Sequence, residues 1–216
     1  MKKNCHQVLQ RRQLGEQTFV LRFERKGLAF QPGQYLNVGL SDDGQQREYS
    51  IYSGQHDDFL EILVQTIPTG HVSSRLGQLM HGDQVLVEGP HGRFTLAESC
   101  LTQQKYTLIA TGTGIAPFHC FAQSYSALEY HLLHGIRQST QRYDHHTYPP
   151  ERYTPCITQG QNGAYHGRVT DYLKERRIDP EEHYYLCGNS DMIYEVFALL
   201  TQNGVSREQV FTEVYY

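Results

Sequence analysis

The chain has 216 residues, of which 38% are hydrophobic, and a formal net charge of -4 at neutral pH. This length accommodates one large domain or two domains of about 100 residues each. The mildly acidic balance gives no electrostatic case for nucleic-acid binding. Because we find neither a signal-peptide pattern nor an apolar run long enough to span a bilayer, we expect a cytoplasmic protein with no membrane span.

The first hundred residues have the pattern of short strands separated by turns. Runs rich in β-branched and aromatic residues alternate with turn sequences such as Gln31-Pro32-Gly33 and His81-Gly82-Asp83. Strands this short and regularly spaced predict an antiparallel β-barrel. We expect the strands over 18–23, 34–38, 48–52, 60–64 and 84–88, with one short helix over 72–79.

The second half changes to alternating strands and helices. This alternation predicts an α/β domain with a mainly parallel sheet and helices on both faces. We expect strands over 106–110, 130–135, 154–158, 184–187 and 209–215, and helices over 117–126, 169–176 and 192–202. The polar tract 138–152 is predicted as a surface loop, or as a short helix plus a loop. The polar stretch 97–105 marks the boundary, which gives domains over 1–99 and 104–216.

Two segments of the first half have the chemistry of a phosphate and flavin site. In Arg47-Glu48-Tyr49-Ser50, alternation puts Arg47 and Tyr49 on one face and Ser50 on the other. A guanidinium can hold a pyrophosphate, and an aromatic ring can lie on a flavin. The second segment, Gly70-His71-Val72-Ser73-Ser74, stands where a loop enters a helix and has free amides for an anion. Taken singly, the same segments also fit an ordinary barrel strand and an ordinary serine-capped helix.

The second half has a glycine turn in a strand–turn–helix context. It runs Thr111-Gly112-Thr113-Gly114-Ile115-Ala116-Pro117-Phe118, with the proline where a first-turn proline is tolerated. Glycines allow a ligand to approach the backbone closely, and a helix N-terminus favours a diphosphate. The run is not GxGxxG, so the ordinary dinucleotide fingerprint does not apply.

Two further motifs follow later strands of the same sheet. Cys187-Gly188-Asn189 ends one strand, and ligands of parallel sheets bind beyond the carboxyl ends of strands. Both glycine turns are therefore expected to face one crevice, although Cys187 by itself also fits a buried structural thiol. On the terminal strand, alternation puts Glu213 and Tyr215 on one face and Val214 on the other.

These motifs, in this order, resemble the ferredoxin–NADP reductase superfamily over about residues 18–215. The resemblance implies an N-terminal antiparallel barrel that binds FAD and a C-terminal α/β domain that binds NADPH or NADH. It also implies the role of each residue. For FAD, Arg47 and the amides of Gly70, His71, Val72, Ser73 and Ser74 hold the diphosphate, Tyr49 packs on the flavin, and Ser50 lies near its reactive nitrogen. For the coenzyme, Thr111, Gly112, Thr113, Gly114 and Pro117, with Gly188, cradle the diphosphate and ribose, and Cys187 lies by the nicotinamide. Glu213 relays a proton with Ser50, and Tyr215 covers the flavin.

The chain departs from the family pattern at two places. Plant-type members end on the final tyrosine, whereas here Tyr216 follows; we predict that Tyr215 stacks on the flavin because it shares a face with Glu213. NADP-specific relatives often have an arginine where this chain has Gln159. Losing that charge-assisted pair weakens selection of NADP by about 1.5–3 kcal/mol. Arg168, Arg137 or Arg142 can compensate, so both coenzymes stay open.

The function predicted from the resemblance is hydride transfer between NAD(P)H and FAD, with electrons passed to a ferredoxin or flavodoxin. The five cysteines are widely spaced, with no CxxC pair, so no cysteine-ligated iron–sulfur cluster or zinc site is expected and the acceptor is separate. Candidate docking groups are Arg75, Arg93 and Lys105. The alternatives are a detached reductase component of an oxygenase, a reductase of free flavin or ferric chelates, an FAD-binding electron-transfer subunit and a non-catalytic binding module. The pairs His131/His134 and His145/His146 invite a metal hypothesis, but three-residue spacing in a strand separates the first pair, and we predict no metal site.

Overall fold

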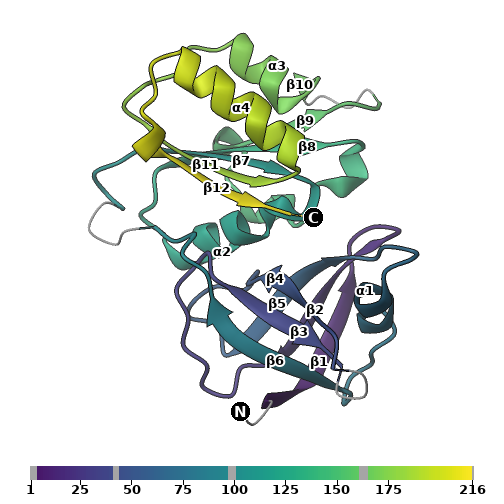
Figure 1. The fold of residues 1–216 in the computed structure, drawn as a ribbon. Helices are drawn as coiled ribbons and strands as arrows, with labels where there is room; N and C mark the ends of the chain where they lie inside the picture. Colours follow the sequence, from purple (N-terminus) through teal and green to yellow (C-terminus); the bar gives the residue numbers. More distant parts are fainter. Residues whose placement is uncertain (1–3, 41–43, 97–100, 161–164, 216) are drawn as a thin grey trace. The chain divides into compact units, whose positions relative to one another are not determined.

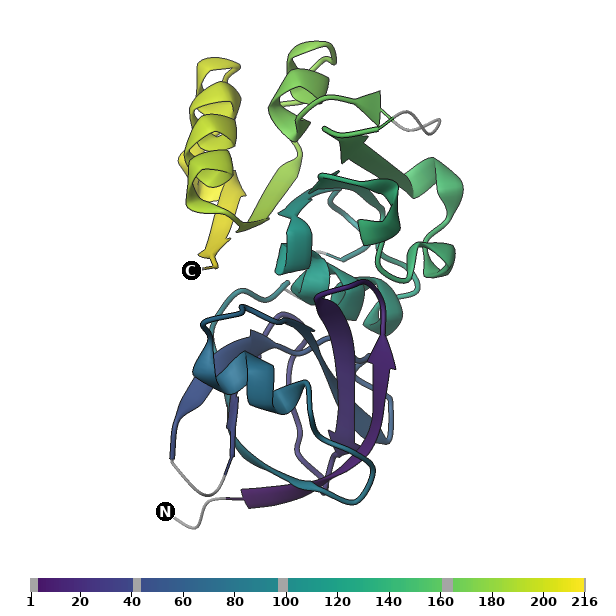
Figure 2. The same cartoon turned by 90° about the vertical axis from the view of Figure 1, so that its right-hand side faces the viewer.

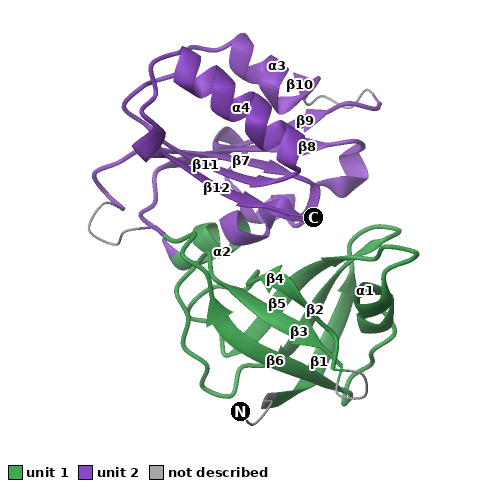
Figure 3. Cartoon of the chain, in the orientation of Figure 1, with its two compact units in different colours: residues 1–95, 119–124 green, residues 96–118, 125–216 purple. Residues whose placement is uncertain are grey.

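The computed structural model describes residues 4–40, 44–96, 101–160 and 165–215. The chain divides into two compact units, Met1–Thr95 with His119–Ser124, and Leu96–Phe118 with Tyr125–Tyr216 (Figure 3). The end of helix α2 (Ala116–Ser124) therefore clusters with the first unit. This part of the helix follows the predicted boundary at 97–105 along the chain.

The first unit is built on an antiparallel barrel (Figure 1). In the described residues its sheet has the strand order β4-β3-β6-β1-β2-β5, and the bridge between Ile51 and Ile62 connects the two ends of this order. The predicted antiparallel barrel is confirmed. Its strands are β1 (Asn4–Gln13), β2 (Thr18–Glu24), β3 (Tyr35–Gly39), β4 (Gln46–Ser50), β5 (Phe59–Gln65) and β6 (Gln84–His91).

Strand β1 is not among the predicted elements. Most of its residues are Asn, Gln, Arg or His, so the composition hides the strand pattern. Among residues 5–13 of this strand, whose burial is described, His6 and Val8 are the buried ones, and Val8 pairs with Phe23 in the barrel core. The strand forms because β2 and β6 both pair with it, which is a long-range effect that local propensity does not show.

Helix α1 (His71–Leu76) connects β5 to β6 and is shorter than the predicted helix over 72–79. Val72 and Leu76 are buried in the barrel core and hold the helix against the strands. Gly77 caps the helix, and the next amides, of Gln78 and Leu79, bond carbonyls only three residues back. The prediction ran too long because it followed the apolar period through this glycine.

The second unit contains a parallel sheet with the order β10-β9-β8-β7-β11-β12 in the described residues. The chain moves outward from β7 through β8, β9 and β10, and then returns to the other side of β7 as β11. The strand order therefore reverses between β7 and β11. The strands are β7 (Tyr106–Thr111), β8 (Tyr130–Ile136), β9 (Tyr153–Ile157), β10 (Tyr165–His166), β11 (His183–Gly188) and β12 (Val210–Val214).

Helices α3 (Val169–Lys174) and α4 (Ser190–Gln202) lie side by side over one face of this sheet (Figure 2). Their apolar residues, including Val169, Leu173, Val196 and Leu200, pack on Ile109, Leu133 and Leu186 of the strands. The start of α2 lies on the opposite side of the sheet (Figure 1). The predicted parallel sheet with helices on both faces is thus confirmed. Within the described ranges, we find no helix that is long and apolar enough to cross a membrane.

The polar tract between β8 and β9 is more structured than a surface loop. It forms the short 3-10 turns η3 (Ser139–Gln141), η4 (His145–Thr147) and η5 (Pro150–Arg152). Tyr143 and Tyr148 are each only 3% exposed, so the tract packs two aromatic rings into the second unit. The prediction of a loop was incomplete because the tyrosines are isolated among polar residues and show no periodicity.

Candidate functional site

Two turns meet at the carboxyl ends of β7 and β11, where the strand order reverses. The first, η2 (Gly112–Ile115), follows β7 directly, and the second begins at Gly188, the last residue of β11. A Cβ atom on Gly114 would lie 2.7 Å from both the carbonyl carbon of Cys187 and the Cα of Gly188. The reversal of strand order is the place where parallel α/β sheets bind ligands. The expectation that the two turns lie together is thus matched by their geometry.

Thr111 ties the same two turns together. Its Oγ1 accepts a hydrogen bond of 2.9 Å from the amide of Asn189. Gly188 has φ +124, and a Cβ there would lie 2.8 Å from the carbonyl oxygen of Thr111. Gly112 has φ +53, and a Cβ placed on it would meet nothing within 4 Å, so its far side is open. Bare backbone on both turns, next to the start of α2, fits a dinucleotide diphosphate, which needs close approach and amide donors.

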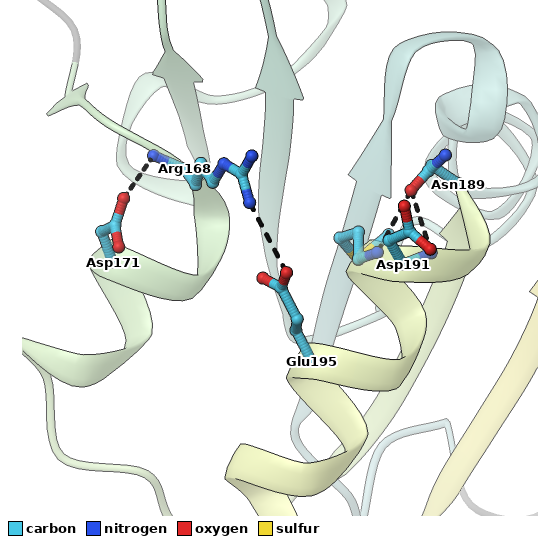
Figure 4. A network of polar contacts seen from close by, with 6 residues as sticks. Arg168, Asp171, Asn189, Asp191 and Glu195 are labelled. Carbon is cyan, nitrogen blue, oxygen red and sulfur yellow. Dashed lines mark hydrogen bonds and ion pairs between the residues drawn. The ribbon is translucent and has the colours of Figure 1, made fainter.

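Asn189 also begins the next helix. Its Oδ1 accepts hydrogen bonds from the amides of Asp191 at 3.0 Å and Met192 at 3.2 Å (Figure 4). This N-cap explains why α4 begins two residues before the predicted start at 192. One residue therefore links the turn after β11 to the helix that packs behind it.

Cys187 lies between these turns and the terminal strand. Its side chain is fully buried, and β12 pairs with β11 so that Glu213 lies opposite Cys187. Burial raises the pKa of the Cys187 thiol well above its usual value, and the Glu213 charge adds to this, while a hydrogen bond from Tyr215 opposes it. The group is therefore a neutral thiol near pH 7. Glu213 and Tyr215 both act on the same sulfur, as expected from their shared face.

His134 is the residue of this region whose part the sequence reasoning missed. It is completely buried on β8, and its two ring nitrogens lie 2.8 Å from the carbonyl oxygen of Gly112 and 3.0 Å from the Tyr153 hydroxyl. Burial lowers the pKa of His134 to about 4, although the bond to Gly112 acts in the opposite direction. Sequence reasoning considered this histidine only as a metal ligand. In the described part of the chain, no group of three or more His, Cys, Asp or Glu side chains could hold a metal.

The lowered pKa of His134 predicts acid destabilisation of the fold. Because the folded-state pKa, about 4, lies below the reference value of 6.5, the neutral ring contributes stability above pH 6.5 that is lost as the pH falls towards 4. Between pH 7 and pH 5, we expect this group to cost about 2 kcal/mol of unfolding free energy. Denaturant unfolding of the wild type and His134→Gln at both pH values measures the difference. Burial also lowers the pKa of His6 and His131, so the variant should lose part of the pH dependence. Equal acid sensitivity in both proteins would contradict the expectation.

The carboxyl edge of β8, β9 and β10 collects the residues considered for coenzyme choice. The amide of Gln159 bonds the carbonyl of Arg137 at 2.8 Å, and both side chains are exposed. Arg168 follows β10 and is also exposed; its Nη1 lies 3.5 Å from Glu195 Oε1 of α4 (Figure 4). Arg142, in contrast, lies beside Tyr153, whose pKa its charge lowers against the larger effect of burial. Of the three candidate arginines, Arg137 and Arg168 therefore lie at this edge, and Arg142 lies beside Tyr153 instead.

In the first unit, β4 presents the three residues predicted to meet a flavin. Tyr49 pairs with Leu36 and Arg47 with Val38, so both side chains lie on the face of two core residues, and Ser50 lies on the other. Arg47 is exposed, Tyr49 is half-buried against the core, and Ser50 is 3% exposed. Burial raises the pKa of Tyr49 to about 12, so it is a neutral phenol. An exposed guanidinium beside a half-buried ring suits a diphosphate joined to an aromatic system.

The segment at the start of α1 is held by its own serines. Ser73 Oγ accepts a hydrogen bond from the amide of Ile67, and Ser74 Oγ donates one to the carbonyl of Ile67. A Cβ on Gly70 would lie 2.8 Å from Ser73 Oγ, so any larger residue there would displace the Ser73 side chain. No side chain caps α1, so the ordinary interpretation as a serine-capped helix is wrong. Two of the amides predicted to hold a diphosphate are already used, because the amide of Gly70 bonds the carbonyl of Ile67 and the amide of Ser74 bonds the carbonyl of Gly70. Tyr216, the other residue discussed for the flavin face, lies outside the described residues.

Comparison with protein families agrees with this division of the chain. Residues 7–96 match the oxidoreductase FAD-binding domain, and residues 108–197 match the oxidoreductase NAD-binding domain. The first match covers the barrel that contains Arg47 and α1. The second covers the sheet that contains the paired glycine turns.

Individual relatives give the same family. The chain is 30% identical over 222 residues to ferredoxin–NADP reductase A of Sorangium cellulosum, with 88% of this chain and 79% of that protein aligned. It is also 30% identical to the toluate 1,2-dioxygenase electron transfer component of Pseudomonas putida, aligning 94% of this chain but spanning only 65% of that longer protein. A ferredoxin NADP+ reductase from Neisseria gonorrhoeae, solved with bound FAD and NADP, superposes with a TM-score of 0.85 over 100% of both chains at 21% identity. The chain therefore belongs to the ferredoxin–NADP reductase superfamily, with the FAD-binding and NAD-binding domains of that family.

Proposed function

We propose that the chain is an FAD-dependent reductase that takes hydride from NADPH or NADH and passes electrons to a ferredoxin or flavodoxin. The observation that carries the proposal is the contact between Gly114 and the Cys187–Gly188 backbone at the reversal of strand order. It brings two glycine turns and a buried thiol together at one place. The FAD-binding and NAD-binding domains are proposed to span 1–99 and 104–216. A cytoplasmic location and the lack of nucleic-acid binding stay predictions.

When bound, FAD supplies a two-electron acceptor that can release electrons singly. The residues of this chain bind and orient. We assign the coenzyme diphosphate and ribose to Thr111, Gly112, Thr113, Gly114, Pro117 and Gly188. We assign the FAD diphosphate to Arg47 and to the amides at the start of α1 other than those of Gly70 and Ser74, which bond backbone carbonyls. We assign the flavin ring to Tyr49 and Tyr215.

The neutral Cys187 thiol is proposed to pack beside the nicotinamide and fix its position. It cannot act as a thiolate, because burial and the Glu213 charge raise its pKa. Ser50 and Glu213 are proposed to hold and pass a proton. These two residues belong to different units, so this part of the proposal depends on the family resemblance.

We propose that Arg168 faces the adenosine ribose of the coenzyme. With the nicotinamide assigned to β11 and the diphosphate to the turn after β7, the other half of the coenzyme extends over β8, β9 and β10. Arg168 lies at that edge and forms an ion pair with Glu195, whereas the side chain of Gln159 is neutral. The ion pair is largely exposed and is therefore weak, so a 2′-phosphate can compete for the guanidinium.

Replacing Arg168 by glutamine should lower kcat/KM for NADPH by about five- to tenfold and leave NADH within about twofold, since one exposed charged contact contributes roughly 1 kcal/mol. Glu195→Gln should favour NADPH. Steady-state rates with each coenzyme measure both effects. Arg176→Gln is the matched control, because Arg176 lies just beyond the other end of α3, over the Tyr172 ring. An equal loss with both coenzymes would show that Arg168 does not meet the 2′-phosphate.

The acceptor is tested by a panel assayed with the preferred coenzyme. A ferredoxin, a flavodoxin, free FMN and ferric citrate are compared by kcat/KM for each. We expect a protein acceptor to exceed the small acceptors by at least about tenfold, since docking adds interface contacts. Reduction of FMN or ferric citrate alone would favour the free-flavin or ferric reductase alternative. The match to a dioxygenase component keeps the oxygenase alternative, which is tested by adding a ferredoxin of that class.

A further inference from the structure

A buried chain of hydrogen bonds leads from the tract 138–153 to the coenzyme turn. The Tyr153 hydroxyl lies 3.0 Å from His134 Nδ1, and His134 Nε2 lies 2.8 Å from the carbonyl oxygen of Gly112. Gly112 is the first residue of η2 and has φ +53. The chain therefore ends on the residue whose conformation sets the course of the turn.

The direction of the two bonds at His134 follows from the Gly112 carbonyl and the neutral ring. A carbonyl oxygen can only accept, so Nε2 donates to Gly112. In a neutral imidazole Nδ1 is then the acceptor, and the Tyr153 hydroxyl donates to it. This is the neutral imidazole with its proton on Nε2, and the lowered pKa of His134 agrees with it.

Aromatic packing holds His134 from several elements. The Tyr143 ring centroid lies 5.9 Å from that of His134, and Tyr148 stacks on Tyr153 at 5.2 Å. The titratable groups around the ring are therefore Tyr143 and Tyr148 from the 3-10 tract, Tyr153 from β9, and Arg142. All but Arg142 are uncharged near neutral pH. These rings are buried, because His134, Tyr143 and Tyr148 are each at most 3% exposed.

We propose that His134 is a positioning residue for coenzyme binding, whose Nε2–H holds the Gly112 carbonyl and thereby fixes the turn that meets the diphosphate. The inference rests on the proposed function of that turn. An open glycine has many backbone conformations, and a single buried donor selects one of them. Tyr153 contributes indirectly because it holds the imidazole in the tautomer that donates to Gly112.

Two variants separate the ends of the imidazole. The amide nitrogen of His134→Gln reaches the position of Nε2, whereas the shorter side chain of His134→Asn reaches only that of Nδ1. Calorimetric titration with NAD+ and with NADP+ gives dissociation constants that do not depend on turnover. We expect His134→Asn to weaken binding about tenfold, His134→Gln to stay within about threefold of the wild type, and Tyr153→Phe to lie between them. Flavin content and reduction by dithionite should be unchanged in all three.

A purely structural role predicts a different pattern, in which both variants lower the melting temperature and the folded protein binds the coenzyme normally. That pattern would overturn the proposal, as would equal binding by the asparagine and glutamine variants. A second readout needs no coenzyme: nitrogen-15 NMR of the wild-type imidazoles should show His134 as the Nε2-protonated neutral ring down to pH 5. A ring with its proton on Nδ1, or one titrating near pH 6.5, would also overturn it. If the wild type binds neither coenzyme, the proposed function fails, and the NMR result still decides the hydrogen-bond direction.

Discussion

Replacing Gly114 by alanine is expected to lower kcat/KM for coenzyme oxidation by about 100-fold. The added Cβ would lie 2.7 Å from the carbonyl carbon of Cys187 and from the Cα of Gly188, and both are backbone atoms that cannot rotate away. The turn after β7 must then move back from β11, and a displacement of about 1 Å at a reacting site costs on the order of 10² in rate. Stopped-flow reduction with NADH and NADPH measures the loss.

Gly204→Ala, just after α4, is the matched control for this substitution. Gly204 has φ +89 and a Cβ on it meets nothing within 4 Å, so the variant should lose only the roughly 1–2 kcal/mol of stability that an alanine in the left-handed region costs. Both variants should keep their flavin, because residues 7–96 match the FAD-binding domain and both substitutions lie in the second unit. Coenzyme kinetics close to those of the wild type in Gly114→Ala would mean that contact between the two turns is not needed for activity.

Replacing Cys187 by alanine is expected to lower the limiting rate of flavin reduction by about 10- to 100-fold, with a much smaller change in coenzyme affinity. The thiol is buried beside Glu213 and Tyr215, so its loss leaves a gap where the nicotinamide is proposed to pack. Cys187→Ser should retain more activity than alanine, because the neutral thiol fills space and does not act as a nucleophile. The dependence of the reduction rate on coenzyme concentration separates rate from affinity.

The control for Cys187 is Cys156→Ala on β9. Cys156 is also buried, and burial raises its pKa to about 12, but it lies in the core under α3. The control should lower stability and leave the rate of flavin reduction within about twofold. Similar rate losses in both variants would indicate a general effect of damage to the second unit, and Cys187 would then have no special position.

The parallel sheet could be predicted from sequence because its strands are continuous apolar runs between helical periods, as in Tyr106–Thr111. Strand β1 could not, since its polar residues form a strand only between two partners far along the chain. The division of α2 between the two units has the same origin. Its second half contains His119, which stacks on Tyr52 with ring centroids 3.9 Å apart, and no local pattern announces such a contact.

The candidate site shows the same limit at the level of single residues. Glycines of both turns were found because their strand–turn–helix context is local. The contact of Gly114 with Cys187 followed from the rule for parallel sheets. His134 was missed because its partners, Gly112 and Tyr153, lie 22 and 19 residues away and meet it only through strand pairing. The sequence offered a histidine followed by a glycine as a signal, but it does not show that the histidine is buried.

Anaerobic reduction of the purified, FAD-loaded protein by NADPH and by NADH, in separate cuvettes and followed by visible absorption, tests the central claim most directly. We expect the flavin bands to bleach at low concentration of at least one coenzyme, with the Arg168 and Glu195 variants changing which one. A protein that cannot be loaded with FAD, or whose bound flavin neither coenzyme reduces, would contradict the proposal that this chain is an NAD(P)H-dependent flavin reductase.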